Sequence, residues 1–196
     1  MASPQIHNKA PATKAKIRRS LVDALGGPSA ARVIESHSGP GVMRGLAYGG
    51  VADWVGIDTD PESPDAIHAD SRLVMRAIGL HRFNLFDLDA FGSPWEWVWI
   101  VSQRRRPEKG ERVALAITNG HAGAVAARTK AQVSRQLIDA GITPGNANKW
   151  VSGKRGAELY AQRLVAAWFD GCVIRRWLTA AANGGAWYFG VILEGL

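Results

Sequence analysis

The sequence of 196 residues has a single cysteine, Cys172, and no long apolar run. One thiol excludes an internal disulfide and a metal site built from several thiolates. The longest apolar stretch, AWYFGVIL near the C-terminus, falls short of the roughly 18 residues that a spanning helix needs. The basic N-terminal residues contain no apolar stretch typical of a secretory signal. We therefore expect no membrane segment and a reducing, cytoplasmic setting.

Acidic side chains are outnumbered: 24 Lys and Arg stand against 17 Asp and Glu, a formal net charge of +7. Excess positive charge suits a polyanion, because neutralised phosphates release their counterions. We therefore expect a nucleic acid, RNA or DNA, as partner, and the alternative is that the charge only keeps the protein soluble. The five histidines are scattered without ligand spacing, so we expect no metal site.

Hydrophobic residues make up 46% of the chain, which is typical of an ordinary folded domain. We expect residues 1–12 to form a loose tail and residues 13–196 to form one domain. Apolar residues recur every four positions after the tail, which predicts an amphipathic helix with a solvated basic face, ended by Gly26-Gly27-Pro28. The apolar positions are Ile17, Leu21 and Leu25, and the basic ones are Lys14, Lys16, Arg18 and Arg19.

Short apolar bursts then alternate with helix-length stretches. The bursts predict strands at 32–35, 54–58, 83–89 and 112–117, and the intervening stretches predict helices at 42–48, 70–79 and 94–106. Such alternation favours an α/β fold, a mostly parallel central sheet with helices on both faces. The last third predicts helices at 125–141 and 155–168, followed by a C-terminal antiparallel hairpin around Asn183-Gly184.

The first predicted strand runs into the turn Glu35-Ser36-His37-Ser38-Gly39-Pro40-Gly41 and then into a helix. Glycines at such a turn let backbone N–H groups approach a ligand closely. Asp58 ends the second strand. An acid that binds a ribose diol lies about 20 residues after the glycine turn, and Asp58 is close to that position. The next glycine, Gly45, comes one place too late for a dinucleotide fingerprint. A nucleotide-type site without hydride chemistry is predicted.

This arrangement resembles the S-adenosylmethionine-dependent methyltransferases of the Rossmann-like class. Glu35, Gly39 and Gly41 match their first motif, and His37 stands where a glycine is commoner. The resemblance implies S-adenosylmethionine as cofactor, with Asp58 on the ribose hydroxyls and Asp70 near the adenine. The cofactor residues that it implies are Glu35, His37, Ser38, Gly39, Gly41, Asp58, Thr59, Asp70 and Ser71.

The segment NLFDLDAFGSPW, residues 84–95, is similar to the AspProPheGlySerPro segment of tRNA guanine N2-dimethyltransferases, with Ala90 in place of the proline. A carboxylate that accepts hydrogen bonds from the N–H groups of an exocyclic amine helps the methylation of that amine. The resemblance therefore implies that Asp89 is this acceptor and that Phe91 stacks on the base, with Trp95 as a second wall. In the alternative interpretation Asp89 is a helix N-cap and Phe91 a core residue.

Three tryptophans alternate in the stretch that follows, where Ser93-Pro94 favours a buried helix ending in Arg104, Arg105 and Arg106. We expect these arginines to lie near the active-site edge and to bind substrate phosphates, although cations at a helix C-terminus also complement its dipole. The prediction is an N-methyltransferase acting on a nucleic-acid base. One alternative is a methyltransferase-like module that binds nucleic acid or a protein without transfer, and another is methylation of a protein or small molecule.

Overall fold

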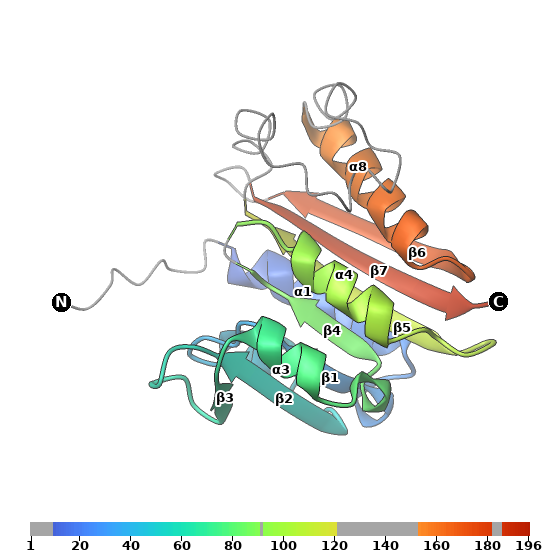
Figure 1. Ribbon diagram of the computed structural model, residues 1–196. Coiled ribbons are helices and arrows are strands. Elements are labelled where there is room, and N and C mark those ends of the chain that lie inside the picture. The colour runs from blue at the N-terminus through green and yellow to red at the C-terminus, as the bar shows by residue number, and fades with distance from the viewer. Residues whose placement is uncertain (1–9, 91, 121–152, 182–185) are drawn as a thin grey trace.

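The computed structural model describes residues 10–90, 92–120, 153–181 and 186–196. Its centre is a seven-stranded sheet with the strand order β3-β2-β1-β4-β5-β7-β6 (Figure 1). Strands β1 to β5 are parallel, and β7 is antiparallel to both β5 and β6. The strands are β1 Arg32–Glu35, β2 Asp53–Asp58, β3 Ala66–His68, β4 Leu85–Leu88, β5 Arg112–Asn119, β6 Cys172–Ala181 and β7 Trp187–Gly195.

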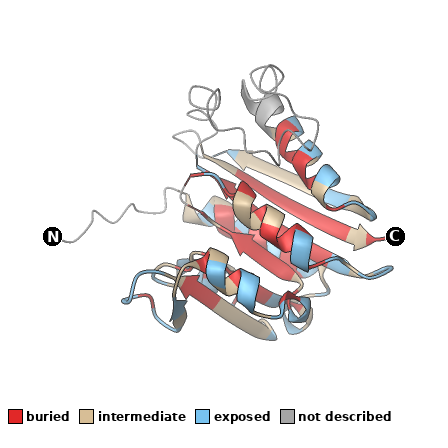
Figure 2. Cartoon of the chain, in the orientation of Figure 1, coloured by how far each residue is buried: buried red, intermediate tan, exposed pale blue. Residues whose placement is uncertain are grey.

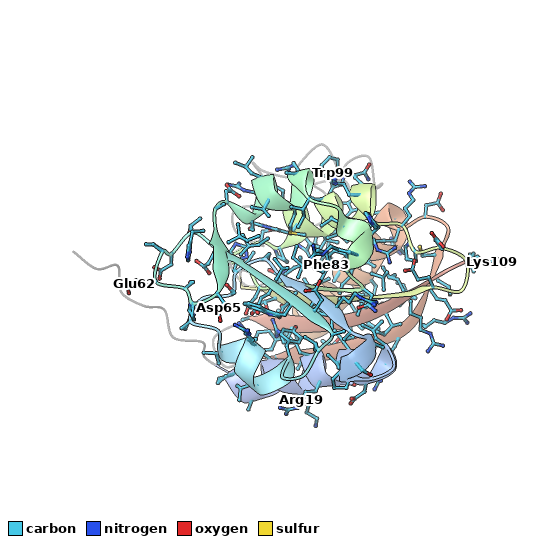
Figure 3. All side chains as sticks on the ribbon, turned by 90° about the horizontal axis from the view of Figure 1, so that it is seen from below. Arg19, Glu62, Asp65, Phe83, Trp99 and Lys109 are labelled. Carbon is cyan, nitrogen blue, oxygen red and sulfur yellow. The ribbon has the colours of Figure 1, made fainter. Side chains whose placement is uncertain are left out.

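Helices cover both faces of this sheet (Figure 1). The apolar side of α1 packs with α2 residues on one face, and α3, α4 and α8 pack on the other. Arg19 of α1 and Trp99 of α4 accordingly lie on opposite sides of the sheet (Figure 3). The helices are α1 Pro11–Ala24, α2 Val42–Ala47, α3 Ser71–Ala77, α4 Trp95–Arg104 and α8 Gly153–Trp168, with 3-10 turns η1 Pro28–Ala30 and η2 Leu80–Arg82.

The central strands are buried on both sides (Figure 2). Successive side chains of a strand point to opposite faces. In β4, Phe86 and Leu88 therefore pack with the α4 layer, while Leu85 packs with the α1 layer. The same alternation turns Asp87 and Asp89, two places and four places after Leu85, toward α1. The face of the sheet on which they lie therefore decides the neighbours of both carboxylates.

The predicted α/β fold is confirmed, including the parallel sheet and the C-terminal antiparallel hairpin. Strand β3 has only three residues, which is too short to show as an apolar burst, and the sequence pattern missed it. The tail prediction was wrong at its end, because α1 begins at Pro11 and proline fits the first turn of a helix. The predicted helix at 125–141 lies outside the described residues.

No helix in the described residues is long and apolar enough to cross a membrane. The same part of the chain holds no group of three or more His, Cys, Asp or Glu side chains that could bind a metal ion.

Candidate functional site

The glycine turn after β1 is fastened to the end of β2. The Gly39 N–H donates to Asp58 Oδ2 at 2.7 Å, and the Ser38 N–H donates to the Ile57 carbonyl at 3.1 Å. Gly39 and Gly41 have φ angles of 49° and 76°, a region that glycine adopts without steric cost. The predicted turn and the predicted acid thus lie together at the carboxyl edge of the sheet.

The Asp58 carboxylate retains acceptor capacity in this position. Its Oδ2 accepts from Gly39 and its Oδ1 accepts from the Asp60 N–H at 2.9 Å. An ionised carboxylate has roughly four lone-pair sites, so each oxygen can accept a further hydrogen bond. Two adjacent hydroxyl groups fit such an acceptor. Thr59, the next predicted residue, is exposed beside it.

The environment of the Ser38 hydroxyl favours a ligand at this turn. Ser38 is 5% exposed, and its Oγ is buried with no hydrogen-bond partner in the described part of the chain. A buried hydroxyl without a partner costs free energy, about 1–3 kcal/mol. A ligand that supplies a polar group at Ser38 would recover this cost.

Glu35 ends β1 inside the protein and is 1% exposed. Its Oε2 accepts from the Trp54 indole N–H at 3.2 Å, and in the sheet register it is the neighbour of Asp87. Burial, followed by the charge of Asp87, raises the pKa of Glu35 well above its ordinary value. The structure therefore places this predicted cofactor residue beneath the turn, with its carboxyl protonated more readily than usual.

His37, within the turn, packs against α4. Its Nδ1 is 2.8 Å from Ser36 Oγ, and its ring meets the Trp97 ring edge-on at a centroid distance of 4.9 Å. The Trp97 indole N–H donates in turn to Ser71 Oγ at 2.8 Å. These contacts bring two predicted residues, His37 and Ser71, to one side of the site. Burial lowers the pKa of His37, so its imidazole is neutral at neutral pH.

Asp70 caps α3 at the same edge. Its Oδ1 accepts from the Arg72 N–H at 2.9 Å, and its Oδ2 accepts from the Arg72 guanidinium at 2.6 Å. The hydrogen bonds from the Arg72 side chain outweigh the opposing effect of burial and lower the pKa of Asp70 to about 2. Asp70 is thus a charged group beside Ser71.

Asp87 and Asp89 form a buried charge cluster with two cations of α1. Arg18 binds Asp87 with two hydrogen bonds of 2.5 Å, and Tyr48 donates to Asp87 at 2.7 Å. Lys14 Nζ binds both oxygens of Asp89, at 2.8 and 2.6 Å, and Arg18 lies 3.5 Å from the same carboxylate. The prediction of a solvated basic face on this helix was wrong for Lys14 and Arg18, which are 8% and 2% exposed.

These cations determine the state of Asp89. Burial alone would raise the pKa of Asp89, but Arg18 and then Lys14 outweigh it and hold that pKa below its ordinary value. Asp89 is therefore a charged hydrogen-bond acceptor and a weak base. Its side chain is 14% exposed, so the carboxylate is not fully closed off from solvent.

The turn after Asp89 is closely packed. Ala90 is 3% exposed, and the Gly120 N–H donates to the Gly92 carbonyl at 2.9 Å, which ties the loop after β5 to the loop after β4. Phe91, the predicted stacking residue, lies outside the described residues. Trp95 is 8% exposed and meets the Tyr160 ring at 5.7 Å, so its indole is mostly a core side chain.

The predicted position of the three arginines was wrong. Helix α4 starts at the carboxyl edge of the sheet and runs back, so its last residues lie at the opposite edge. Arg105 is buried, donates to the Phe83 carbonyl before β4 and pairs with Glu111 before β5. Arg104 donates to the Ile78 carbonyl, and Arg106 is exposed. Lys109, in the following loop, lies at the far end of the molecule from Glu62, which follows β2 (Figure 3).

The sequence reasoning missed Trp97 and the cluster of Lys14, Arg18 and Asp87. A signal existed for the cluster, because Asp87 and Asp89 are two places apart on a strand, a rise of about 6.8 Å. Lys14 and Arg18 are four places apart on a helix, a rise of about 6 Å. The two spacings match, so two cations of one helix can meet two acids of one strand.

Comparison with known proteins gives a fold and no closer relationship. No family model and no curated protein matches the sequence. The chain is similar in structure to Trm1 from Pyrococcus horikoshii in complex with S-adenosyl-L-methionine, with a TM-score of 0.61, 17% identity, and coverage of 98% of this chain and 57% of that one. It thus spans little more than half of that protein's length.

Two further solved structures have the same fold. The magnesium protoporphyrin IX methyltransferase ChlM from Synechocystis PCC 6803 with bound SAH has a TM-score of 0.55 and 13% identity, covering 100% of this chain and 90% of that one. TYW2 from M. jannaschii in complex with AdoMet has a TM-score of 0.54 and 9% identity, covering 98% and 78%. The likeness confirms a Rossmann-like methyltransferase fold.

Proposed function

We propose that this chain binds S-adenosylmethionine at the glycine turn and transfers the methyl group to an exocyclic amino group of a nucleic-acid base. The observation that carries the proposal is the hydrogen bond from Gly39 to Asp58, because it joins the turn and the diol-binding acid at one edge of the sheet. Several solved structures with a similar fold contain S-adenosylmethionine or SAH. The cofactor supplies a methyl group activated by a positively charged sulfur.

The residues of this edge fit the cofactor. Asp58 has free acceptor positions for the ribose hydroxyls, and Ser38 offers its buried Oγ together with the backbone of Gly39 and Gly41. Thr59, Asp70 and Ser71 line the approach on the adenine side. Glu35 would support the turn from below, and His37 would lie toward the reacting end.

Asp89 is the acceptor for the target amine. Lys14 Nζ already donates to both of its oxygens, so the carboxylate is arranged to bind one nitrogen with two N–H bonds. A base amino group would donate to the lone pairs that Lys14 leaves free on these oxygens and would have its own lone pair directed away from the ring. Phe91 would stack on the base. The formal net charge of +7 supports a nucleic acid as the substrate.

Two measurements test the proposal. Calorimetry should detect binding of S-adenosylmethionine and of its demethylated product, and radiolabelled donor should transfer methyl to an RNA or DNA pool and not to a protein pool. Asp89→Asn should lower transfer at least about 100-fold with product affinity within about threefold of wild type. Asp65→Asn, on an exposed loop, is the matched control. Absence of cofactor binding at millimolar donor would reject the proposal.

A second candidate, a module that binds cofactor and nucleic acid without transfer, is favoured by one observation. Asp89 is engaged by Lys14 and Arg18, and both cations compete with a substrate amine. Cofactor binding with no methyl transfer to RNA, DNA or protein pools would support this candidate over the enzyme.

A further inference from the structure

His37 is held on two sides in a fixed orientation. Ser36 Oγ engages Nδ1 at 2.8 Å, and Trp97 packs against the ring at 4.9 Å with an interplanar angle of 68°. Trp97 is itself held by its hydrogen bond to Ser71. In the described part of the chain Nε2 has no hydrogen bond. The ring therefore has one nitrogen fixed by the protein and one available to a ligand.

The proposed methyl transfer needs a proton acceptor, because a primary amino group that gains a methyl group must release a proton. The carboxylates of the site are already engaged as hydrogen-bond acceptors. Asp89 is neutralised by Lys14 and Arg18, and Asp87 accepts bonds from Arg18 and Tyr48. Asp58 binds two backbone N–H groups, and the pKa of Asp70 is about 2. All four carboxylates are engaged as hydrogen-bond acceptors, and the lowered pKa values of Asp89 and Asp70 make these two weak bases.

The charges around His37 suit a group that changes from neutral to positive. The acids that act on it are Asp87 of β4, Asp89 just after β4, Asp58 at the end of β2 and Asp70, the N-cap of α3, and they favour the imidazolium. Burial opposes them and prevails, which lowers the pKa of His37. The facing cations are Lys14 and Arg18 behind the β4 acids and Arg72, whose guanidinium lies 5.8 Å from the Trp97 ring centroid. The imidazole is thus neutral beforehand, with one N–H, and the acids stabilise the imidazolium once Nε2 has taken a second proton.

We infer that His37 is the catalytic proton acceptor of the proposed methyl transfer and that its Nε2 takes the proton that the target amine releases. The inference rests on the proposed function. The target nitrogen uses its lone pair to bond the methyl carbon, with the electrons of the broken C–S bond left on sulfur. Nε2 takes the proton of one target N–H, whose electrons remain on nitrogen. Asp89 holds the amine by hydrogen bonds during this step.

The variant His37→Asn tests the inference, because the asparagine amide can keep the hydrogen bond to Ser36 and has no atom at the Nε2 position. His81→Asn is the matched control, since His81 is an exposed histidine of η2 at the other edge of the sheet. Single-turnover transfer to the RNA or DNA pool that accepts methyl should fall about 100-fold or more in His37→Asn. Affinity for the demethylated product should stay within about threefold, and His81→Asn should match wild type.

The pH profile of the rate and an NMR titration of the imidazole distinguish a catalytic from a structural role of His37. A purely structural role would not link the pKa of the imidazole to the rate. The wild-type rate should fall about tenfold per pH unit below the pKa of His37, and His37→Asn should lose this limb. NMR titration of the imidazole in the protein without cofactor should give the same pKa, below 6.5. A His37→Asn variant with the wild-type rate and pH profile, or an imidazole that titrates above 6.5, overturns the role of His37 alone. No transfer by wild type to any pool overturns the proposed function and this inference together.

Discussion

Glu35 shows how burial of one carboxyl affects the whole protein's response to pH. Its pKa in the folded state lies above the ordinary value because of burial and the neighbouring Asp87. Above about pH 4.5 the unfolded chain releases this proton while the folded chain keeps it. The folded state then binds more protons than the unfolded state, so its stability falls as the pH rises until the folded pKa is reached.

The variant Glu35→Gln should remove this loss of stability. The glutamine side-chain oxygen can still accept from the Trp54 indole, and the amide has no proton to release. We expect the variant to be more stable than wild type at pH 7, by about 1 kcal/mol or more, and the difference to shrink toward pH 4. Urea unfolding at several pH values measures it. Glu62→Gln, in an exposed loop, is the control, and parallel wild-type and Glu35→Gln curves would contradict the expectation.

Single residues at the glycine turn could be predicted because residue type and spacing in the sequence are enough to indicate the turn and its acid. Gly39 and Asp58 were predicted from spacing alone, and the structure joins them by a hydrogen bond. The partner of Asp89 could not be predicted in this way. It depends on which face of β4 the side chain takes and on a lysine 75 positions earlier, and no local pattern contains both.

Helix α1 is attached to β4 by charge as well as by apolar packing. Arg18 and Asp87 are 2% and 0% exposed at their side chains, so each is desolvated and depends on the other. Loss of one partner in such a pair leaves an uncompensated buried charge, a cost of about 3–5 kcal/mol. The cluster therefore links the position of α1 to the position of the candidate acceptor.

Arg18→Met should destabilise the protein by about 3–5 kcal/mol, because it leaves Asp87 with Tyr48 alone. The double variant Arg18→Met/Asp87→Asn should recover more than half of this loss, since no bare charge remains. Chemical denaturation of the purified variants gives both values. Arg19→Met changes an exposed arginine one place along the helix and should cost less than about 1 kcal/mol. A loss below about 1 kcal/mol in Arg18→Met would show that the pair contributes little.

Periodicity predicted α1 and its apolar side, because Ile17 and Leu21 are buried at helical spacing. It also assigned every charged position to solvent. That assumption fails where a strand presents acids at matching intervals, as Asp87 and Asp89 do. Such a cluster is visible only when the two elements are considered together.

The whole molecule has an excess of positive charge. Many of its arginines are paired with acids, such as Arg76 with Glu96 and Arg82 with Asp53, yet a net charge of +7 remains. The proposed interaction with a nucleic acid would use this excess of positive charge to bind phosphates. It should be sensitive to salt, because bound phosphates release counterions.

Binding of an RNA or DNA pool should weaken with salt. Three neutralised phosphates would lower the affinity about 40-fold between about 50 and about 200 mM salt, as measured by fluorescence anisotropy. Methyl transfer by Arg106→Gln should equal that of wild type, because Arg106 follows α4 at the edge opposite the site. Affinity that does not change with salt would argue for a substrate that is not a nucleic acid.

The overall architecture could be predicted because alternating strands and helices have few ways to pack, and right-handed crossovers leave one arrangement of the parallel strands. The position of Arg104 to Arg106 followed from the same topology, since a helix that leaves the carboxyl edge must end at the other. The prediction failed because residues that follow the site closely in sequence were assumed to lie close to it in space.

Strand order also has a consequence for synthesis on the ribosome. In the described part of the chain β6 hydrogen-bonds to β7 and to no other strand. The nascent chain therefore exposes β6 before the strand that connects it to β5 has emerged. Until β7 inserts between them, both flanking strands present open backbone to other chains, and this interval is when a chaperone would best shield the polypeptide.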